Sequence, residues 1–90
     1  MSELIIELQR VSLGEEAQAV IREEFKKGGI SHGRLAVGGI TSAPEMIYFL
    51  WHEGGEVPVS MLFTRDALNE DHRTREAASV FLWKWKRRLV

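Results

Sequence analysis

The stretch MIYFLWH, residues 46–52, decides the fold. Its seven residues are mostly aromatic or aliphatic and include no glycine or proline, which is typical of a buried β-strand. The segment TSAP, residues 41–44, precedes it with turn-forming residues, and EGGE, residues 53–56, follows it as a hairpin loop. Short connections join antiparallel neighbours. The sequence therefore predicts that this strand lies between two antiparallel partners.

The flanking sequence supplies those partners and two helices. Strands are predicted over residues 32–37 and 57–64, and alternating apolar residues predict another strand near the N-terminus. Ser12 and Glu15 have the spacing of a capping box, which predicts a helix from near Leu13 that ends at Gly28-Gly29. A last helix is predicted from Asn69 or Asp71 to the end of the chain.

Both helices carry an apolar stripe at helical spacing. In the first helix the stripe consists of Leu13, Ala17, Val20, Ile21 and Phe25. In the last helix it consists of Thr74, Ala78, Phe81, Leu82, Trp85 and Leu89. The predicted fold is thus a single α+β domain over residues 1–90. Its order is β-α-β-β-β-α, with a mostly antiparallel sheet and both helices packed on one face.

Composition limits the class of protein. The chain has 90 residues, 44% of them hydrophobic and 28% charged, which is typical of one globular domain. It has no cysteine, which excludes disulfides, thiol chemistry and cysteine-based zinc sites. The N-terminal MSELIIELQR lacks the basic region of a signal peptide, and the longest apolar run, residues 46–51, is far shorter than the ~20 residues of a membrane span. We expect a soluble, cytoplasmic protein.

Simple hairpins around TSAP and EGGE assign every strand residue to a face of the sheet. The face expected beneath the helices carries Leu35, Val37, Met46, Tyr48, Leu50, Val57, Val59, Met61 and Phe63. The opposite face then carries Arg34, Ala36, Ile47, Phe49, Trp51, Pro58, Ser60 and Leu62. A second face this apolar indicates an interaction site. Two alternatives are that a terminal segment or the first strand covers it, and that a one-residue bulge exchanges the faces.

Trp83 is the other residue that stands out. It lies on the polar side of the last helix beside Glu76, Val80 and Arg87. An exposed Trp next to an Arg is typical of a binding hot spot. The alternatives are a cation–π contact with Arg87 or Lys86 and packing against the N-terminal strand.

These patterns favour a small non-catalytic protein-binding module, such as an adaptor, regulator or inhibitor. We expect it to form a homodimer or to dock another protein, with no cofactor. The candidate contact residues are Ile47, Phe49, Trp51, Leu62, Trp83 and Arg87.

The alternative function is weak nucleic-acid binding by the cations of the last helix, Lys84, Lys86, Arg87 and Arg88. The element order over residues 12–90 resembles, in outline, the double-stranded RNA-binding domain, which would imply recognition of RNA shape and phosphates. That family places a lysine cluster at the start of its last helix. The corresponding stretch here, NEDHRTRE at residues 69–76, has three acids and two arginines, so the chain departs from the family at this contact. Membrane binding is not expected, because the aromatic stripe of this helix is needed for the core.

The sequence shows no catalytic or metal constellation. His32 and His52 are predicted at the same end of the sheet, near Glu53, without the spacing of a metal motif, while His72 is predicted at the other end. Ser31 precedes His32, but no orienting group completes a nucleophile–base pair. The segment GGIT, residues 38–41, lacks the glycine spacing and the lysine of a phosphate loop. We therefore expect a protein that is not an enzyme.

Overall fold

The computed structural model of the chain describes residues 4–52 and 59–88. The elements are β1 (Leu4–Gln9), α1 (Glu15–Lys27), β2 (Gly33–Ile40), β3 (Ala43–His52), β4 (Val59–Thr64), a short 3₁₀ helix η1 (Arg65–Leu68) and α2 (Asp71–Arg88). The predicted α+β class and the order β-α-β-β-β-α are confirmed. Among the described helices, none combines the length and the apolar character that a membrane crossing requires.

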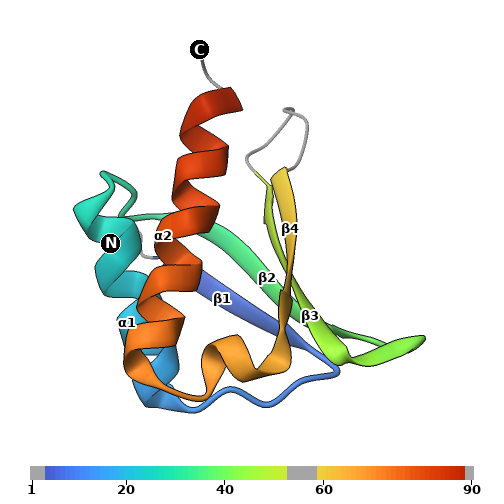
Figure 1. The fold of residues 1–90 in the computed structure, drawn as a ribbon. Coiled ribbons are helices and arrows are strands. Elements are labelled where there is room, and N and C mark those ends of the chain that lie inside the picture. The colour runs from blue at the N-terminus through green and yellow to red at the C-terminus, as the bar shows by residue number, and fades with distance from the viewer. Residues whose placement is uncertain (1–3, 53–58, 89–90) are drawn as a thin grey trace.

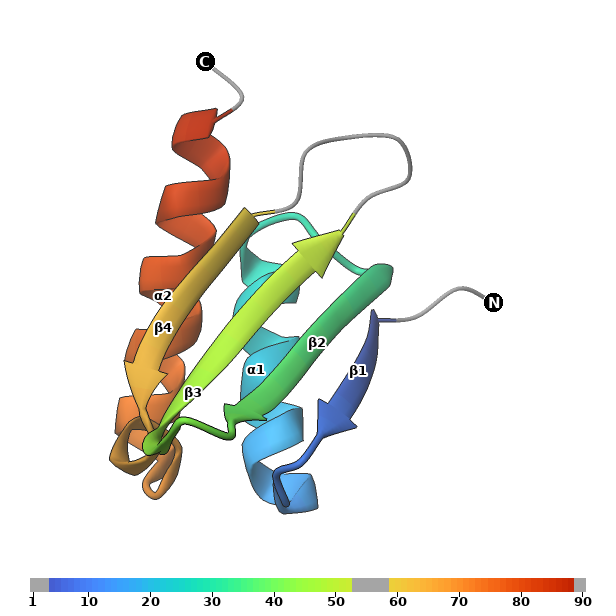
Figure 2. The same ribbon diagram turned by 90° about the vertical axis from the view of Figure 1, so that its right-hand side faces the viewer.

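The four strands form one sheet in the order β1-β2-β3-β4. The β2–β3 and β3–β4 pairs are antiparallel, but β1 is parallel to β2, so the sheet is mixed. The parallel pair follows from the connection, because α1 carries the chain back across the sheet before β2 begins. Both helices lie on the same side of the sheet (Figure 1). Figure 2 looks onto the other side, which no described helix or strand covers.

The register between β2 and β3 differs from the predicted hairpin and exchanges the two faces of β3. Leu35 pairs with Trp51 and Val37 pairs with Phe49. The next pairs are Gly39 with Ile47 and Ile40 with Ala43, so β3 advances four residues there while β2 advances one. The three extra residues in β3 leave the rest of the pairing one residue away from the predicted hairpin, in which Leu35 would pair with Leu50. A shift of one residue turns each β3 side chain to the opposite face.

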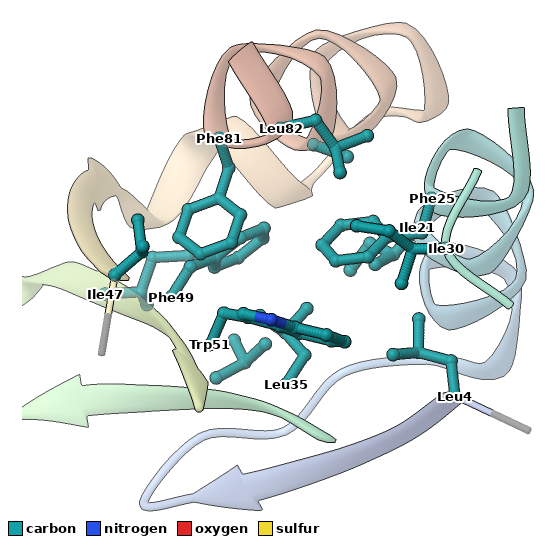
Figure 3. Close-up of a cluster of buried hydrophobic side chains, with 13 residues drawn as sticks. Leu4, Ile21, Phe25, Ile30, Leu35, Ile47, Phe49, Trp51, Phe81 and Leu82 are labelled. Atoms are coloured by element: carbon teal, nitrogen blue, oxygen red, sulfur yellow. The ribbon is translucent and has the colours of Figure 1, made fainter. Parts of the chain in front are cut away.

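The prediction that Ile47, Phe49 and Trp51 lie on an open face is therefore wrong. Their exposed fractions are 0%, 0% and 2%, and all three point toward the helices (Figure 3). Conversely, Met46, Tyr48 and Leu50 were predicted beneath the helices, and the register places them on the other face. The irregularity is larger than the one-residue bulge considered as an alternative, but it has the predicted effect of exchanging the faces.

Aromatic side chains from both layers make the core. Phe81 of α2 contacts Phe49 of β3 at a ring-centroid distance of 5.6 Å and Phe25 of α1 at 6.1 Å. Trp51 packs against Phe25 at 5.8 Å and against Trp85 at 6.5 Å. Each such side chain contributes about 1.5–3 kcal/mol when it is fully buried. The aromatic residues of the middle strand thus hold the two helices on the sheet (Figure 3).

The apolar stripe predicted for the last helix is confirmed within the described residues. Thr74, Ala78, Phe81 and Leu82 are buried and Trp85 packs against the core, while Leu89 lies outside the described residues.

The start of α1 differs from its prediction and its end agrees. The residue before the helix is Gly14, with no side-chain cap, so the capping box predicted from Ser12 and Glu15 is wrong. At the other end Gly29 has φ +91°. Its N–H bonds to the carbonyl of Lys26, and the Ile30 N–H bonds to the carbonyl of Phe25. This is the Schellman motif that a glycine in left-handed conformation permits.

Candidate functional site

The side of the sheet that faces away from the helices carries an apolar centre on β3 and β4. Tyr48 pairs with Leu62, and Leu50 pairs with Ser60 on the next rung. Leu62 is 57% exposed, which is high for a leucine in the middle of a strand. A hollow of about 550 Å³ lies here, lined by Ile40, Tyr48, Leu50, Ser60, Met61, Leu62 and Lys84. We call Tyr48, Leu50 and Leu62 the outer sheet patch.

Tyr48 is held flat on the sheet by its neighbours. It pairs with Gly38 of β2, and a Cβ at Gly38 would collide with the Tyr48 ring. Gly38 therefore lets the ring lie against the backbone. The Tyr48 hydroxyl donates a hydrogen bond to the side-chain oxygen of Gln9 in β1. The ring is thus fixed from two sides and extends the patch across β2 and β3.

Polar residues border the patch on the β1 side. Arg34 of β2 forms an ion pair with Glu7 of β1 at 3.6 Å, and both side chains are largely exposed. Ile5 of β1 pairs with Arg34 in the register and is 45% exposed. An apolar centre with a charged border is the composition of a protein–protein contact surface.

Basic side chains from the helices cover part of both sheet edges. Arg22 of α1 donates from Nε to the Leu4 carbonyl of β1 at 3.2 Å. Lys84 of α2 donates from Nζ to the Ser60 carbonyl of β4 at 2.5 Å. A lysine or arginine on an edge strand hinders pairing with a strand of another chain. Another chain can therefore reach the outer face of the sheet more readily than its edges.

The cations predicted for nucleic-acid binding do not form one patch. Lys84 bonds to β4, whereas Lys86 lines a hollow between α2 and α1. The Arg87 guanidinium carbon lies 4.5 Å from the centroid of the Trp83 ring, which confirms the predicted alternative of a cation–π contact. The side chain of Arg88 lies outside the described part of the chain. Lys84 is thus separate from Lys86 and Arg87, which both lie beside Trp83.

One cluster of charges ties the two helices together. Arg75 of α2 contacts Glu24 at 2.8 Å and Glu23 at 3.2 Å, and Lys27 lies 3.4 Å from both carboxylates. The hydrogen bonds from Arg75, followed by those from Lys27, lower the pKa of Glu23. The Arg75 hydrogen bond likewise lowers the pKa of Glu24, and the two carboxylates raise the pKa of Arg75. Glu23, Glu24 and Arg75 therefore stay charged at neutral pH, which suits a structural cluster and not proton transfer.

The three histidines do not come together where the structure describes them. His32 is exposed, and the Nε2 atom of His72 lies 3.3 Å from a carboxylate oxygen of Glu70. The backbone of His52 pairs with Arg34, while the side chain of His52 and all of Glu53 lie outside the described residues. Over residues 4–52 and 59–88, no three side chains of His, Asp or Glu are grouped as metal ligands would be.

Comparison of the chain with protein-family models, with curated proteins and with solved structures finds no match.

Of the predicted contact residues, Leu62, Trp83 and Arg87 are exposed and the three on β3 are not. Leu62 lies on the sheet and Trp83 lies on α2, so the two belong to different surfaces. The prediction missed Tyr48 and Leu50. One signal could have indicated Tyr48, because a glycine in a strand often accommodates an aromatic ring from the neighbouring strand.

Proposed function

We propose that this chain is a non-catalytic protein-binding module that forms a homodimer through its outer sheet patch. The observation that supports the proposal is the uncovered apolar centre of Tyr48, Leu50 and Leu62 on the side opposite the helices. Phe49, Trp51 and Phe81 are buried, whereas Leu62 is 57% exposed. Such a patch on a small domain is typical of an interaction site.

A second copy of the chain is the partner that fits this surface best. A twofold interface needs a patch that is complementary to itself, and an apolar centre meets that requirement without matching charges. The border pair Arg34–Glu7 offers both signs of charge, so either group can face its opposite in the second copy. The net charge of −1 creates little repulsion between copies. Two sheets packed in this way lie about 10 Å apart with their side chains interdigitated.

An adaptor, regulator or inhibitor role is consistent with a dimer of this kind. The dimer presents a fixed surface to a partner, and none of these roles requires catalysis. We place this role in the cytoplasm, because the chain has no cysteine and needs none in a reducing compartment.

The test is light scattering after size exclusion, over a series of protein concentrations at low and high salt. We expect twice the monomer mass for the wild-type chain. High salt should leave the mass unchanged, because an apolar contact is not screened. Leu50→Asp and Leu62→Asp should each give the monomer mass, since a carboxylate would be buried without a partner. Val80→Asp is the matched control, because Val80 is 41% exposed on α2 and lies away from the patch.

Two results would contradict the proposal. A wild-type chain that stays monomeric at the highest concentration would rule out the homodimer. A dimer that survives both sheet substitutions would place the contact on a different surface. Circular dichroism of each variant checks that the fold is retained.

A further inference from the structure

A second hollow lies in the helix layer, away from the outer sheet patch. Its volume is about 270 Å³, and its lining residues come from the end of α1 and the second half of α2: Glu24, Lys27, Gly28, Ser79, Leu82, Trp83 and Lys86. Trp83 is 58% exposed, the most exposed large hydrophobic residue in the described chain. Tryptophan is the residue type most enriched in binding hot spots.

The groove is shaped by the end of α1. A Cβ at Gly28 would lie 3.2 Å from the Leu82 Cδ1 atom, so a larger residue there would press on α2. The N–H groups of Gly28, Gly29 and Ile30 bond to the last carbonyls of α1 and close the helix at this point. Arg87 lies over the Trp83 ring and restricts its orientation. The floor and one wall of the groove are therefore fixed before any ligand arrives.

The charged groups around the groove that lack a partner of opposite charge are positive. Glu24 lines the hollow, but Arg75 and Lys27 already pair with it. Lys86 and Arg87 have no carboxylate partner within the described residues. Lys86 and Arg87, the second of which stacks on the exposed indole, are complementary to carboxylates that flank an apolar side chain.

We propose that this groove between α1 and α2 binds an acidic segment of another protein. An apolar side chain of the segment enters the hollow beside Trp83, and its carboxylates pair with Lys86 and Arg87. Single-stranded nucleic acid fits less well. It needs an open aromatic face and a track of cations, whereas Arg87 already lies on the ring and Lys84 is bonded to β4.

Fluorescence anisotropy tests the proposal with defined probes. The first probe is a short rhodamine-labelled peptide of glutamates around a central Leu-Phe pair. The comparison peptides have glutamine or lysine in place of every glutamate, and a labelled thymidine oligonucleotide is the nucleic-acid probe. We expect the glutamate peptide to bind most tightly, with an affinity that falls as salt rises.

Substitutions then locate the site. Trp83→Ala should weaken binding of the glutamate peptide by about thirtyfold, as for a hot-spot tryptophan. The double charge reversal K86E/R87E should exchange the preference, so that the lysine peptide binds better than the glutamate peptide. Val80→Ala is the control, because Val80 is exposed on α2 but does not line the groove. Leu62→Asp should bind the peptide as the wild type does, which separates this site from the proposed dimer contact.

Three outcomes would overturn the proposal. The first is equal affinity for the glutamate and glutamine peptides. The second is binding that Trp83→Ala leaves unchanged, provided that the variant keeps its circular dichroism spectrum. The third is tighter binding of the oligonucleotide than of the glutamate peptide, which would establish nucleic-acid binding instead.

Discussion

Replacement of Gly33 by alanine tests the strand register on which the whole assignment of faces depends. Gly33 begins β2 with φ +132°, a conformation that side chains other than glycine rarely adopt. A Cβ at this position would collide with the Trp51 ring and would lie 2.7 Å from its Cζ2 atom. Trp51 is 2% exposed and is held between Phe25 and Trp85, so its ring has no free space to enter.

The expected cost of Gly33→Ala has two parts. The sparsely populated backbone conformation costs about 1–3 kcal/mol for a residue with a Cβ. Displacement of a packed ring in the core costs about 1–3 kcal/mol more. The sum is about 2–6 kcal/mol, against a total stability of about 5–13 kcal/mol for a 90-residue domain. The substitution should therefore remove a large fraction of the free energy of unfolding.

Urea denaturation of four proteins measures the two parts separately. They are the wild type, Gly33→Ala, Trp51→Leu and the double variant. In the Trp51→Leu background the alanine meets a smaller side chain, so its cost should fall to the backbone part. The reasoning is refuted if Gly33→Ala costs less than about 1 kcal/mol, or if its cost is the same in both backgrounds. Either result would mean that Trp51 does not lie against Gly33.

Three further predictions concern stability and are checked by the same denaturation. Gly38→Ala should cost about 1 kcal/mol, because the new methyl group displaces the Tyr48 ring, and the cost should vanish in a Tyr48→Ala background. Thr74→Val should raise the free energy of unfolding by about 1 kcal/mol, because the buried Thr74 hydroxyl has no hydrogen-bond partner among the described residues. Arg75→Gln should flatten the acid limb of the pH profile. The pKa of Glu24 is lowered in the fold, so its contribution is complete above the ordinary value of 4.5 and is lost as the pH falls below it. An equally steep acid limb in Arg75→Gln would exclude this pair as the cause.

The order of the elements could be predicted because local signals fix it. The last helix has one polar side and one apolar side, so the spacing of its apolar residues alone predicts which side faces the core. Gly28-Gly29 ended α1 as predicted, because left-handed backbone at Gly29 has few alternatives to glycine. The parallel pairing of β1 follows from a longer-range cause, the crossover through α1, which the assumption of short connections did not include.

The faces of β3 could not be predicted because its sequence has no polar side. Strand alternation places Tyr48 and Leu50 on one face and Phe49 and Trp51 on the other. Both sets are apolar enough to face the core, so alternation does not distinguish them. The register irregularity between Gly39 and Ile40 accompanies the choice of Phe49 and Trp51 for the helix side, and no alternation pattern in the sequence indicates it. Phe49 packs against Phe81 and Trp51 packs against Phe25, while the Tyr48 hydroxyl bonds to Gln9 on the exposed side of the sheet. For this reason the β3 residues on the outer face are Tyr48 and Leu50, and not the predicted residues one position along the strand.

The two proposed surfaces reinforce each other through the geometry of the fold. The outer sheet patch lies opposite the helices, and the groove beside Trp83 lies between them. A dimer joined by its sheet faces would therefore turn its two grooves away from each other. Lys84 and Arg22 favour this arrangement, because they hinder the edge-to-edge pairing that would place the helix layers side by side. A partner with two acidic segments occupies both grooves only when its linker reaches around the dimer, and its avidity then exceeds the affinity of one segment by about 10²–10⁴. A substitution that breaks the dimer should leave binding of a single peptide intact and abolish only this avidity.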